Sequence, residues 1–173
     1  PFIFEANGKF YVYATGRNGV ALYRADDLFG EWKSLGICAS VPGKIEFWAP
    51  SVIELDGKYY MYVSFMNEGE TDTHLQTMHV LTADSPEGPF GNAKKLIEPF
   101  SIDSHVVKNA AGLFIFYSTN DYEAERAGTY IVVDKMTDPF TVEGKPVAVV
   151  RPTLDEEIFK RDRFRKGQHW HTL

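Results

Sequence analysis

One carboxylate and one large aromatic residue stand in matching segments of two similar parts of this 173-residue chain. Asp103 lies within Phe100–His105, and Trp48 lies within Phe47–Pro50. A carboxyl group can give or take a proton, and an aromatic ring can stack on the C–H face of a sugar. Seen alone, Asp103 would cap a turn and Trp48 would belong to the core. Their location in matching segments of a repeat favours a ligand site.

Three neighbours of this pair could contact the same ligand. Phe47 offers a second aromatic ring next to Trp48, and Glu46 could join them, although we favour a solvated turn for Glu46. His105 would share the side of Asp103 on a strand, because strand side chains alternate with a period of two. The predicted ligand-binding residues therefore include Phe47 and His105 as well as Trp48.

A basic run, Lys160–Lys166, supplies the candidate cation of the site, Arg163, which could reach a sugar hydroxyl or carboxylate. On its own such a run would suggest nucleic acid. The net charge of −6 argues against that function and favours a solvated loop or the rim of a channel. We therefore predict no nucleic-acid partner.

His169 and His171 alternate around Trp170, so on a strand they would face the same side. This pattern fits half of a metal site, the border of a sugar pocket, or surface histidines around a packed tryptophan. The sequence leaves these alternatives open, and we predict no metal ligand set. Cys38 has no partner motif and is expected to be packed.

The elements that would position these residues form a repeat. Each of three segments contains a short apolar strand, a polar turn with glycine and an aromatic-rich strand: 1–13, 50–62 and 104–117. Their glycines, at positions 8, 57 and 112, recur about every 50 residues, a period typical of propellers and other repeat folds. Because each unit is all-β, we predict an all-β fold with about three blades of a β-propeller.

The expected blades span about 1–48, 49–102 and 103–150, and 151–173 would connect toward a fourth blade. An aromatic residue closes the turn after each third strand, and we expect it to plug the space between adjacent blades. The innermost strands of many propellers line the axis, so the strand heads should converge there. About four to eight blades close a propeller. The chain is therefore expected to be a fragment or to associate with itself through open blade edges.

Composition narrows the classes of protein to which the chain could belong. Hydrophobic residues make up 44% of the chain, which indicates a folded core. No apolar run approaches the roughly 18 residues of a membrane helix, so no membrane partner is predicted. Cys38 is the single cysteine and cannot form an intrachain disulfide, which favours a cytoplasmic over a secreted location. The first residue is proline rather than methionine, so we expect preceding residues, with any targeting signal, to be missing.

Nearly all of residues 1–150 resemble the family 43 glycoside hydrolases. The resemblance rests on the order and spacing of five motifs: Pro1–Ile3, Trp48–Val52, Gly57–Tyr62, Ser85–Phe90 and Ile102–Ser104. It implies a five-bladed propeller that hydrolyses β-xylosides, α-arabinofuranosides and related glycosides with inversion, and therefore a carbohydrate partner. It implies no cofactor, although some members carry a calcium ion or water in the axial channel.

The same resemblance implies three carboxylates at the axis. The general base would precede Pro1, the carboxylate that orients the acid and raises its pKa would be Asp103, and the general acid would follow Leu173. Ser104 replaces the proline usual after this aspartate. Glu87 stands in a similar Glu-Gly-Pro motif, but it lies in an outer turn and is rejected as catalytic. Inverting hydrolysis needs two carboxyl groups about 6.5–9.5 Å apart, so the chain by itself is expected to be inactive.

Two other functions fit the same pattern. One is a non-catalytic propeller that binds glycans or proteins, because fold alone does not settle function. The other is a related fructosidase or glycoside phosphorylase, and a phosphorylase would need a basic phosphate site that could enlist Arg163 or Arg165. An aspartate before Pro1 and a glutamate soon after Leu173 would favour the hydrolase over the binding module.

Overall fold

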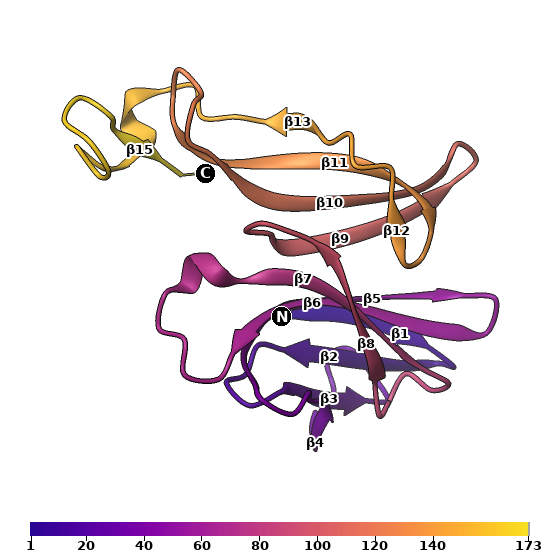
Figure 1. Ribbon diagram of the computed structural model, residues 1–173. Helices are drawn as coiled ribbons and strands as arrows, with labels where there is room; N and C mark the ends of the chain where they lie inside the picture. Colours follow the sequence, from indigo (N-terminus) through magenta and orange to yellow (C-terminus); the bar gives the residue numbers. More distant parts are fainter. Residues whose placement is uncertain (173) are drawn as a thin grey trace.

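Three largely antiparallel β-sheets follow one another along the chain, and the computed structural model describes residues 1–172 (Figure 1). The first sheet contains β1 (Phe2–Ala6), β2 (Lys9–Ala14), β3 (Val20–Ala25) and β4 (Lys33–Ala39). The second contains β5 (Lys44–Leu55), β6 (Lys58–Asn67), β7 (Thr77–Ala83) and β8 (Gly91–Ile97). The third is built on β9 (Ile102–Asn109), β10 (Gly112–Asp121) and β11 (Gly128–Asp138), with β12 (Thr141–Val142) and β13 (Val147–Val150) along β11.

Strands of the first two sheets pair in chain order, as expected within a propeller blade. The all-β prediction is confirmed, because the described helical segments are two short 3₁₀ turns, η1 (Thr73–Leu75) and η2 (Asp155–Glu157). The second sheet starts before the boundary expected at 48/49, since β5 begins at Lys44. We call the three sheets blades one, two and three. No helix in residues 1–172 is long and apolar enough to cross a membrane.

The first hairpin of each blade turns in one of two ways. Asn7-Gly8 and Asp56-Gly57 have positive φ at both turn residues, which suits the twist of a tight hairpin. In blade three, Gly112 pairs with Asn109 and is already the first residue of β10. The third glycine is therefore not equivalent to the other two, and the turn there is Ala110-Ala111.

Blades one and two share an apolar core that a turn aromatic helps to fill. Phe90 closes the turn between β7 and β8, is buried, and packs its ring edge-on against Tyr13 at 6.0 Å. The Tyr13 hydroxyl donates a hydrogen bond of 2.7 Å to the Pro86 carbonyl in the same turn. Such a bond stabilises the folded state by about 1 kcal/mol, so one turn supplies both apolar and polar contacts between the blades.

The same arrangement joins blades two and three. Phe140 packs against Tyr60 with ring centroids 5.6 Å apart, and the Tyr62 hydroxyl donates to the Pro139 carbonyl at 3.0 Å. The prediction that turn aromatics plug adjacent blades is confirmed for Phe90 and Phe140. Strand heads are consequently held in a fixed relation to one another.

Residues 151–172 form a separate hook after β13. The hook contains η2, β14 (Ile158–Lys160) and β15 (Trp170–His171), and β15 pairs in parallel with β11 at Gly128. A Cβ atom at Gly128 would lie 2.3 Å from the His171 carbonyl oxygen, so glycine permits this close approach. The hook projects to the left of blade three in Figure 1.

Candidate active site

The heads of β5 and β9 share an irregular backbone that turns one residue out of each strand. Counting back six residues from the last strand residue before the hairpin turn leads to Ala49 in blade two and Asp103 in blade three. Both have positive φ, 42° and 56°, and both lie in a register shift. A β-bulge re-aims a side chain, and non-glycine residues in this region of φ often mark functional sites. The repeat therefore places a carboxylate at the blade-three head and a methyl group at the blade-two head.

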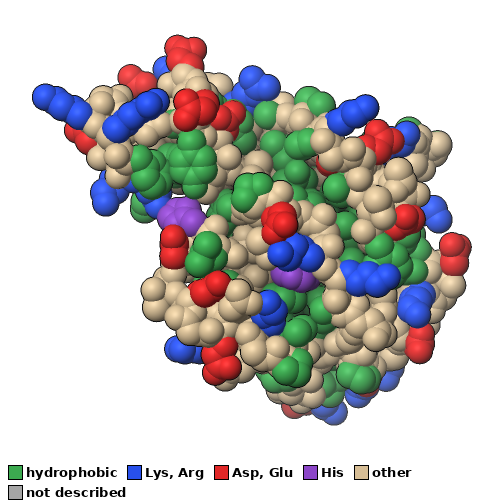
Figure 2. All heavy atoms as spheres, viewed as in Figure 1, with side chains coloured by type: hydrophobic (Ala, Val, Ile, Leu, Met, Phe, Trp, Pro, Cys, Tyr) green, Lys and Arg blue, Asp and Glu red, His purple; other side chains and the backbone are tan. Residues whose placement is uncertain are grey.

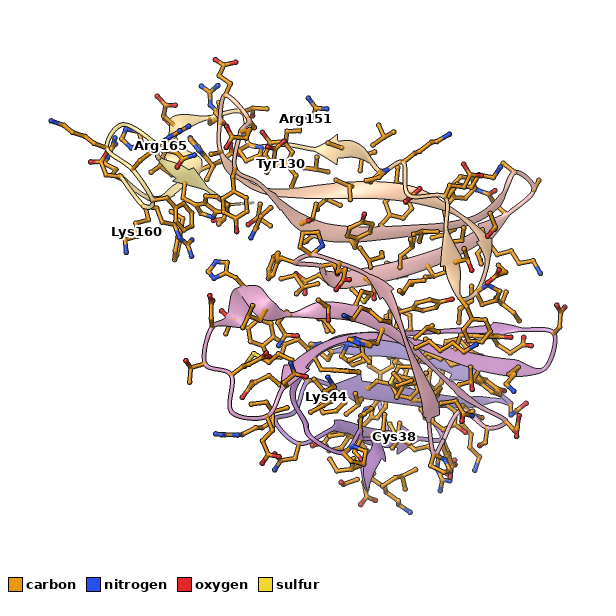
Figure 3. All side chains as sticks on the ribbon, in the orientation of Figure 1. Cys38, Lys44, Tyr130, Arg151, Lys160 and Arg165 are labelled. Atoms are coloured by element: carbon orange, nitrogen blue, oxygen red, sulfur yellow. The ribbon has the colours of Figure 1, made fainter. Side chains whose placement is uncertain are left out.

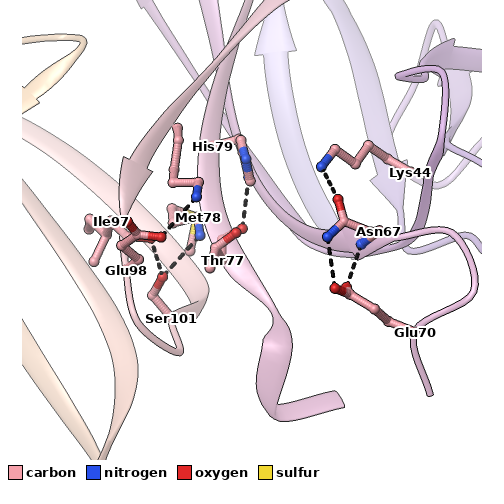
Figure 4. A network of polar contacts seen from close by, with 10 residues as sticks. Lys44, Asn67, Glu70, Thr77, Met78, His79, Ile97, Glu98 and Ser101 are labelled. Atoms are coloured by element: carbon pink, nitrogen blue, oxygen red, sulfur yellow. Dashed lines mark hydrogen bonds and ion pairs between the residues drawn. The ribbon is translucent and has the colours of Figure 1, made fainter. Parts of the chain in front are cut away.

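Ser101 fixes the backbone two residues before Asp103 (Figure 4). Its buried hydroxyl accepts from the Met78 N–H at 2.9 Å and donates to the Ile97 carbonyl at 3.0 Å. Its own N–H donates to the Gln76 carbonyl at 3.3 Å. Because these bonds tie the crossing from β8 to β9 onto β7, the position of Asp103 depends on blade two as well as on its own strand.

A cavity of about 430 Å³ contains Asp103 and is also lined by Ser118, Thr129, Tyr130, Ile131 and Thr172. Partial loss of water raises the pKa of Asp103, while the positive charge of the amino end acts in the opposite direction. Thr172, beside the end of the described chain, is part of the cavity wall. Figure 1 shows both ends of the described chain on the side where β9 begins.

Phe47 and Trp48 have different environments. Phe47 is fully buried, its ring lies 4.9 Å from that of Phe65, and its backbone exchanges hydrogen bonds with Gly16. The prediction that Phe47 contacts a ligand is therefore wrong, because consecutive strand residues point to opposite faces and this one points into the core. Trp48 is half-buried, and its Nε1–H donates to Glu46 at 3.1 Å.

Glu46 is not the solvated turn residue that we favoured. It lies within β5, is half-buried, and has a φ of 57°. Its carboxylate accepts from the Trp48 indole, and its carbonyl accepts from the Gln76 side chain at 2.9 Å. Glu46 thus orients the tryptophan ring at the strand head.

His105 is exposed, and its ring lies 5.8 Å from that of Phe2 in β1. It therefore faces blade one from blade three. Arg163 is not among the residues that line the Asp103 cavity; it contacts His74 and the rings of Phe164 and Trp170. The structure thus brings Asp103 together with Thr172, but it does not bring Arg163 to the same cavity.

The two histidines around Trp170 do not form a pair. His171 is buried and its Nδ1 lies 3.1 Å from the Ala127 carbonyl, whereas His169 lies in a loop beside Asp162. One alternative predicted surface histidines around a packed tryptophan. Trp170 is indeed packed, but His169 and His171 are not both at the surface. Among residues 1–172, no three His, Cys, Asp or Glu side chains gather to hold a metal ion.

Other sequence candidates lie away from the site. Lys160 and Arg165 project from the outer part of the hook (Figure 3), and charged side chains of both signs are interspersed over the face in Figure 2. Glu87 pairs with Arg24 at 2.7 Å, which leaves it in the outer turn where we rejected it. Cys38 is buried, as expected, and burial raises the pKa of its thiol to about 12.

Four residues near the strand heads escaped sequence reasoning. Thr15 accepts from the Ala49 N–H at 3.0 Å, and the hydroxyls of Ser51 and Ser104 lie 3.2 Å apart between blades two and three. The fourth is Thr172. Threonine and serine carry no motif here, and only Ser104 stood out, because it replaces a proline. Leu173 lies outside the described residues.

Comparison with known proteins bears on the same region. The family model for glycosyl hydrolases family 43 matches residues 1–162. A probable arabinan endo-1,5-alpha-L-arabinosidase B of Aspergillus oryzae is 34% identical over 97 residues, 53% of this chain and 26% of that protein. The chain thus spans about a quarter of the length of this curated relative.

Two solved structures cover most of the chain. A thermostable family-43 glycoside hydrolase aligns with a TM-score of 0.75 and 26% identity over 91% of this chain and 54% of its own. The endo-arabinase of Bacteroides thetaiotaomicron aligns with a TM-score of 0.72 and 26% identity over 86% and 54%. The fold is therefore that of the family 43 propellers. With the family model matched over nearly its whole length, the chain belongs to glycoside hydrolase family 43.

Proposed function

We propose that this chain is the Asp103-bearing part of an inverting glycoside hydrolase that acts on arabino- or xylo-type glycosides. The observation that carries the proposal is the place of Asp103. It stands at a bulged strand head, in the left-handed region of φ, in a cavity that Thr172 also lines. The arabinan-cleaving relatives support arabinose-type glycosides as the substrate class.

The reaction needs more than one carboxyl group. One must protonate the leaving oxygen while another removes a proton from water on the opposite face of the sugar, about 6.5–9.5 Å away. In this proposal the residue before Pro1 is the base, and a glutamate after Leu173 is the acid. The negative charge of Asp103 keeps the acid protonated by raising its pKa, because a second like charge nearby is disfavoured.

Asp103 is suited to raising the pKa of the acid, and it is not suited to be the general acid or the general base. Its own raised pKa reflects partial loss of water, which strengthens its electrostatic effect on a neighbour. A single carboxylate cannot stand on both faces of one sugar ring. Trp48, oriented by Glu46, would offer a stacking face to the sugar, and His105 would donate or accept a hydrogen bond with a hydroxyl.

The stereochemistry of the first product tests the proposal. The full-length protein should convert a para-nitrophenyl α-arabinofuranoside or β-xyloside into the sugar of opposite anomeric configuration, because water attacks the face opposite the leaving group. Proton NMR during the first minutes detects the initial anomer before mutarotation. Retention of configuration would contradict the mechanism. Release of a sugar phosphate that depends on added phosphate would identify a phosphorylase instead.

A further inference from the structure

A chain of polar contacts joins the carboxyl-terminal hook to blade two. Arg163 Nη2 lies 3.0 Å from His74 Nε2, although the two residues are 89 positions apart in sequence. On the other side of the ring, His74 Nδ1 lies 2.8 Å from Asp72 Oδ1. Asp72 also caps η1 by accepting from the His74 N–H at 2.9 Å. The contacts therefore run from the hook, through the imidazole, to the start of η1.

The donors and acceptors that these groups offer determine the protonation state and the tautomer of His74. A guanidinium has only donors, so His74 Nε2 must accept from Arg163. The ring proton is then on Nδ1 and is donated to the Asp72 carboxylate. Hydrogen bonds from the His74 backbone and ring, aided by the charge of Arg163, lower the pKa of Asp72, so this carboxylate stays ionised near neutrality. With His74 neutral, Arg163, His74 and Asp72 can all form these hydrogen bonds.

Arg163 is held firmly on its own side. Its guanidinium lies 5.1 Å from the Trp170 ring centroid and 5.2 Å from that of Phe164. Trp170 is 1% exposed, and Tyr122, in the connection between β10 and β11, packs on it with centroids 5.1 Å apart. A shift of the guanidinium would therefore disturb β15 and the residue that follows it. That residue is Thr172, which lines the Asp103 cavity.

We propose that Asp72, His74 and Arg163 form a latch that holds the hook on blade two and so positions Thr172 at the Asp103 cavity. In this role Arg163 is a positioning residue that acts through His74 and Trp170, rather than a sugar ligand. The consequence for catalysis rests on the proposed function. The latch itself is a property of the fold and can be tested without substrate.

The latch should close only when His74 is neutral. Protonation would place an N–H on Nε2 opposite the Arg163 N–H groups, which removes the hydrogen bond and brings two positive charges together. The charged groups that face the ring in the described residues are Asp72 on its own segment and Arg163 on the hook, and the Phe100 ring is its other neighbour, at 5.9 Å. A fall in pH that protonates the ring should therefore open the latch.

Hydrogen exchange of residues 158–172 in the full-length protein measures the latch. Its reporters are the His171 amide, bonded to Ala127 at 2.9 Å, and the Arg163 amide, bonded to Gln168 at 3.2 Å. After correction for the intrinsic effect of pH, protection should fall by more than about tenfold between about pH 8 and pH 5. In Arg163→Met, protection should be low at both pH values.

His74→Gln is the matched control, because the glutamine amide oxygen can accept from Arg163 and does not titrate. This variant should keep its protection at both pH values. Nitrogen NMR of the wild-type histidines at about pH 8 should show the His74 proton on Nδ1. Equal protection of the wild type at both pH values, a pH response that persists in His74→Gln, or a proton on Nε2 would each overturn the latch.

These readouts separate failure of the latch from failure of the proposed function. If exchange and NMR behave as expected but no glycoside is cleaved, the latch stands and the hydrolase proposal fails. If the protein is active, Arg163→Met should lower kcat at every pH, and Arg163→Lys should restore only part of it, because a lysine cannot keep the planar stacking. Activity equal to that of the wild type in Arg163→Met would overturn the link between the latch and Asp103.

Discussion

Replacement of Asp103 by asparagine should lower kcat of the full-length protein by up to about 10²–10⁴-fold, the range for loss of the proton-transferring group itself, because Asp103 acts through that group. The amide keeps the shape of the side chain and tolerates the φ of 56°. It removes the negative charge that would keep the acid protonated. The acid should then lose its proton at lower pH, so the alkaline side of the pH–rate profile should move toward lower pH.

Protein stability distinguishes this role from a structural one. Partial loss of water raises the pKa of Asp103, although the residue is exposed, so at neutral pH its ionised carboxylate opposes folding only slightly. This small cost disappears as the pH falls through its folded pKa. Asp103→Asn should therefore leave the free energy of unfolding at neutral pH unchanged or raise it. Asp84→Asn is the matched control, since Asp84 is exposed and makes one long ion pair of 3.9 Å with Lys58. A stable Asp103→Asn protein with wild-type kcat and pH profile would refute the assignment.

Truncation of two neighbouring aromatic residues should affect different properties, protein stability for Phe47 and KM for Trp48. Phe47→Ala should lower the free energy of unfolding by about 3–5 kcal/mol, because the ring is fully buried against Phe65. Trp48→Ala should change stability much less but raise KM by about tenfold, which corresponds to about 1.4 kcal/mol of lost sugar stacking. Denaturant unfolding and steady-state kinetics on both variants provide the measurements.

A second pair of variants, with leucine in place of alanine, tests the same point with less risk of misfolding. Phe47→Leu keeps most of the core volume and should retain the wild-type KM, whereas Trp48→Leu loses the flat ring and should show most of the increase in KM. If Phe47→Leu raised KM while Trp48→Leu did not, the environments described for these two residues would be wrong.

The blade heads were predictable from the sequence, because they depend on a repeat. Counting along the repeat led to Asp103 and Ala49, and the structure gives both the same unusual backbone. The third hairpin was aligned less well. We matched Gly112 to Gly8 and Gly57, but it pairs with Asn109 within the strand. A glycine marks permitted conformations and does not itself reveal which residue is at the turn.

Side-chain environments were harder to predict than strand positions. Alternation along a strand says that Phe47 and Trp48 face opposite sides, but it does not say which one faces the core. The contact of Arg163 with His74 joins residues 89 positions apart, and nothing in either local sequence indicates the other. Likewise, Glu46 is held by a bulge in β5 that the apolar pattern of the strand does not encode. Long-range packing decides such contacts.

The central claim is that Asp103 works only together with carboxylates contributed from outside residues 1–173. The most direct test is the rate at which the 173-residue chain releases para-nitrophenol from an aryl arabinofuranoside or xyloside, with the full-length protein measured in parallel. We predict hydrolysis by the full-length protein and no release by the 173-residue chain above the buffer rate, with or without Asp103→Asn. Clear turnover by the 173-residue chain that Asp103→Asn abolishes would contradict the claim.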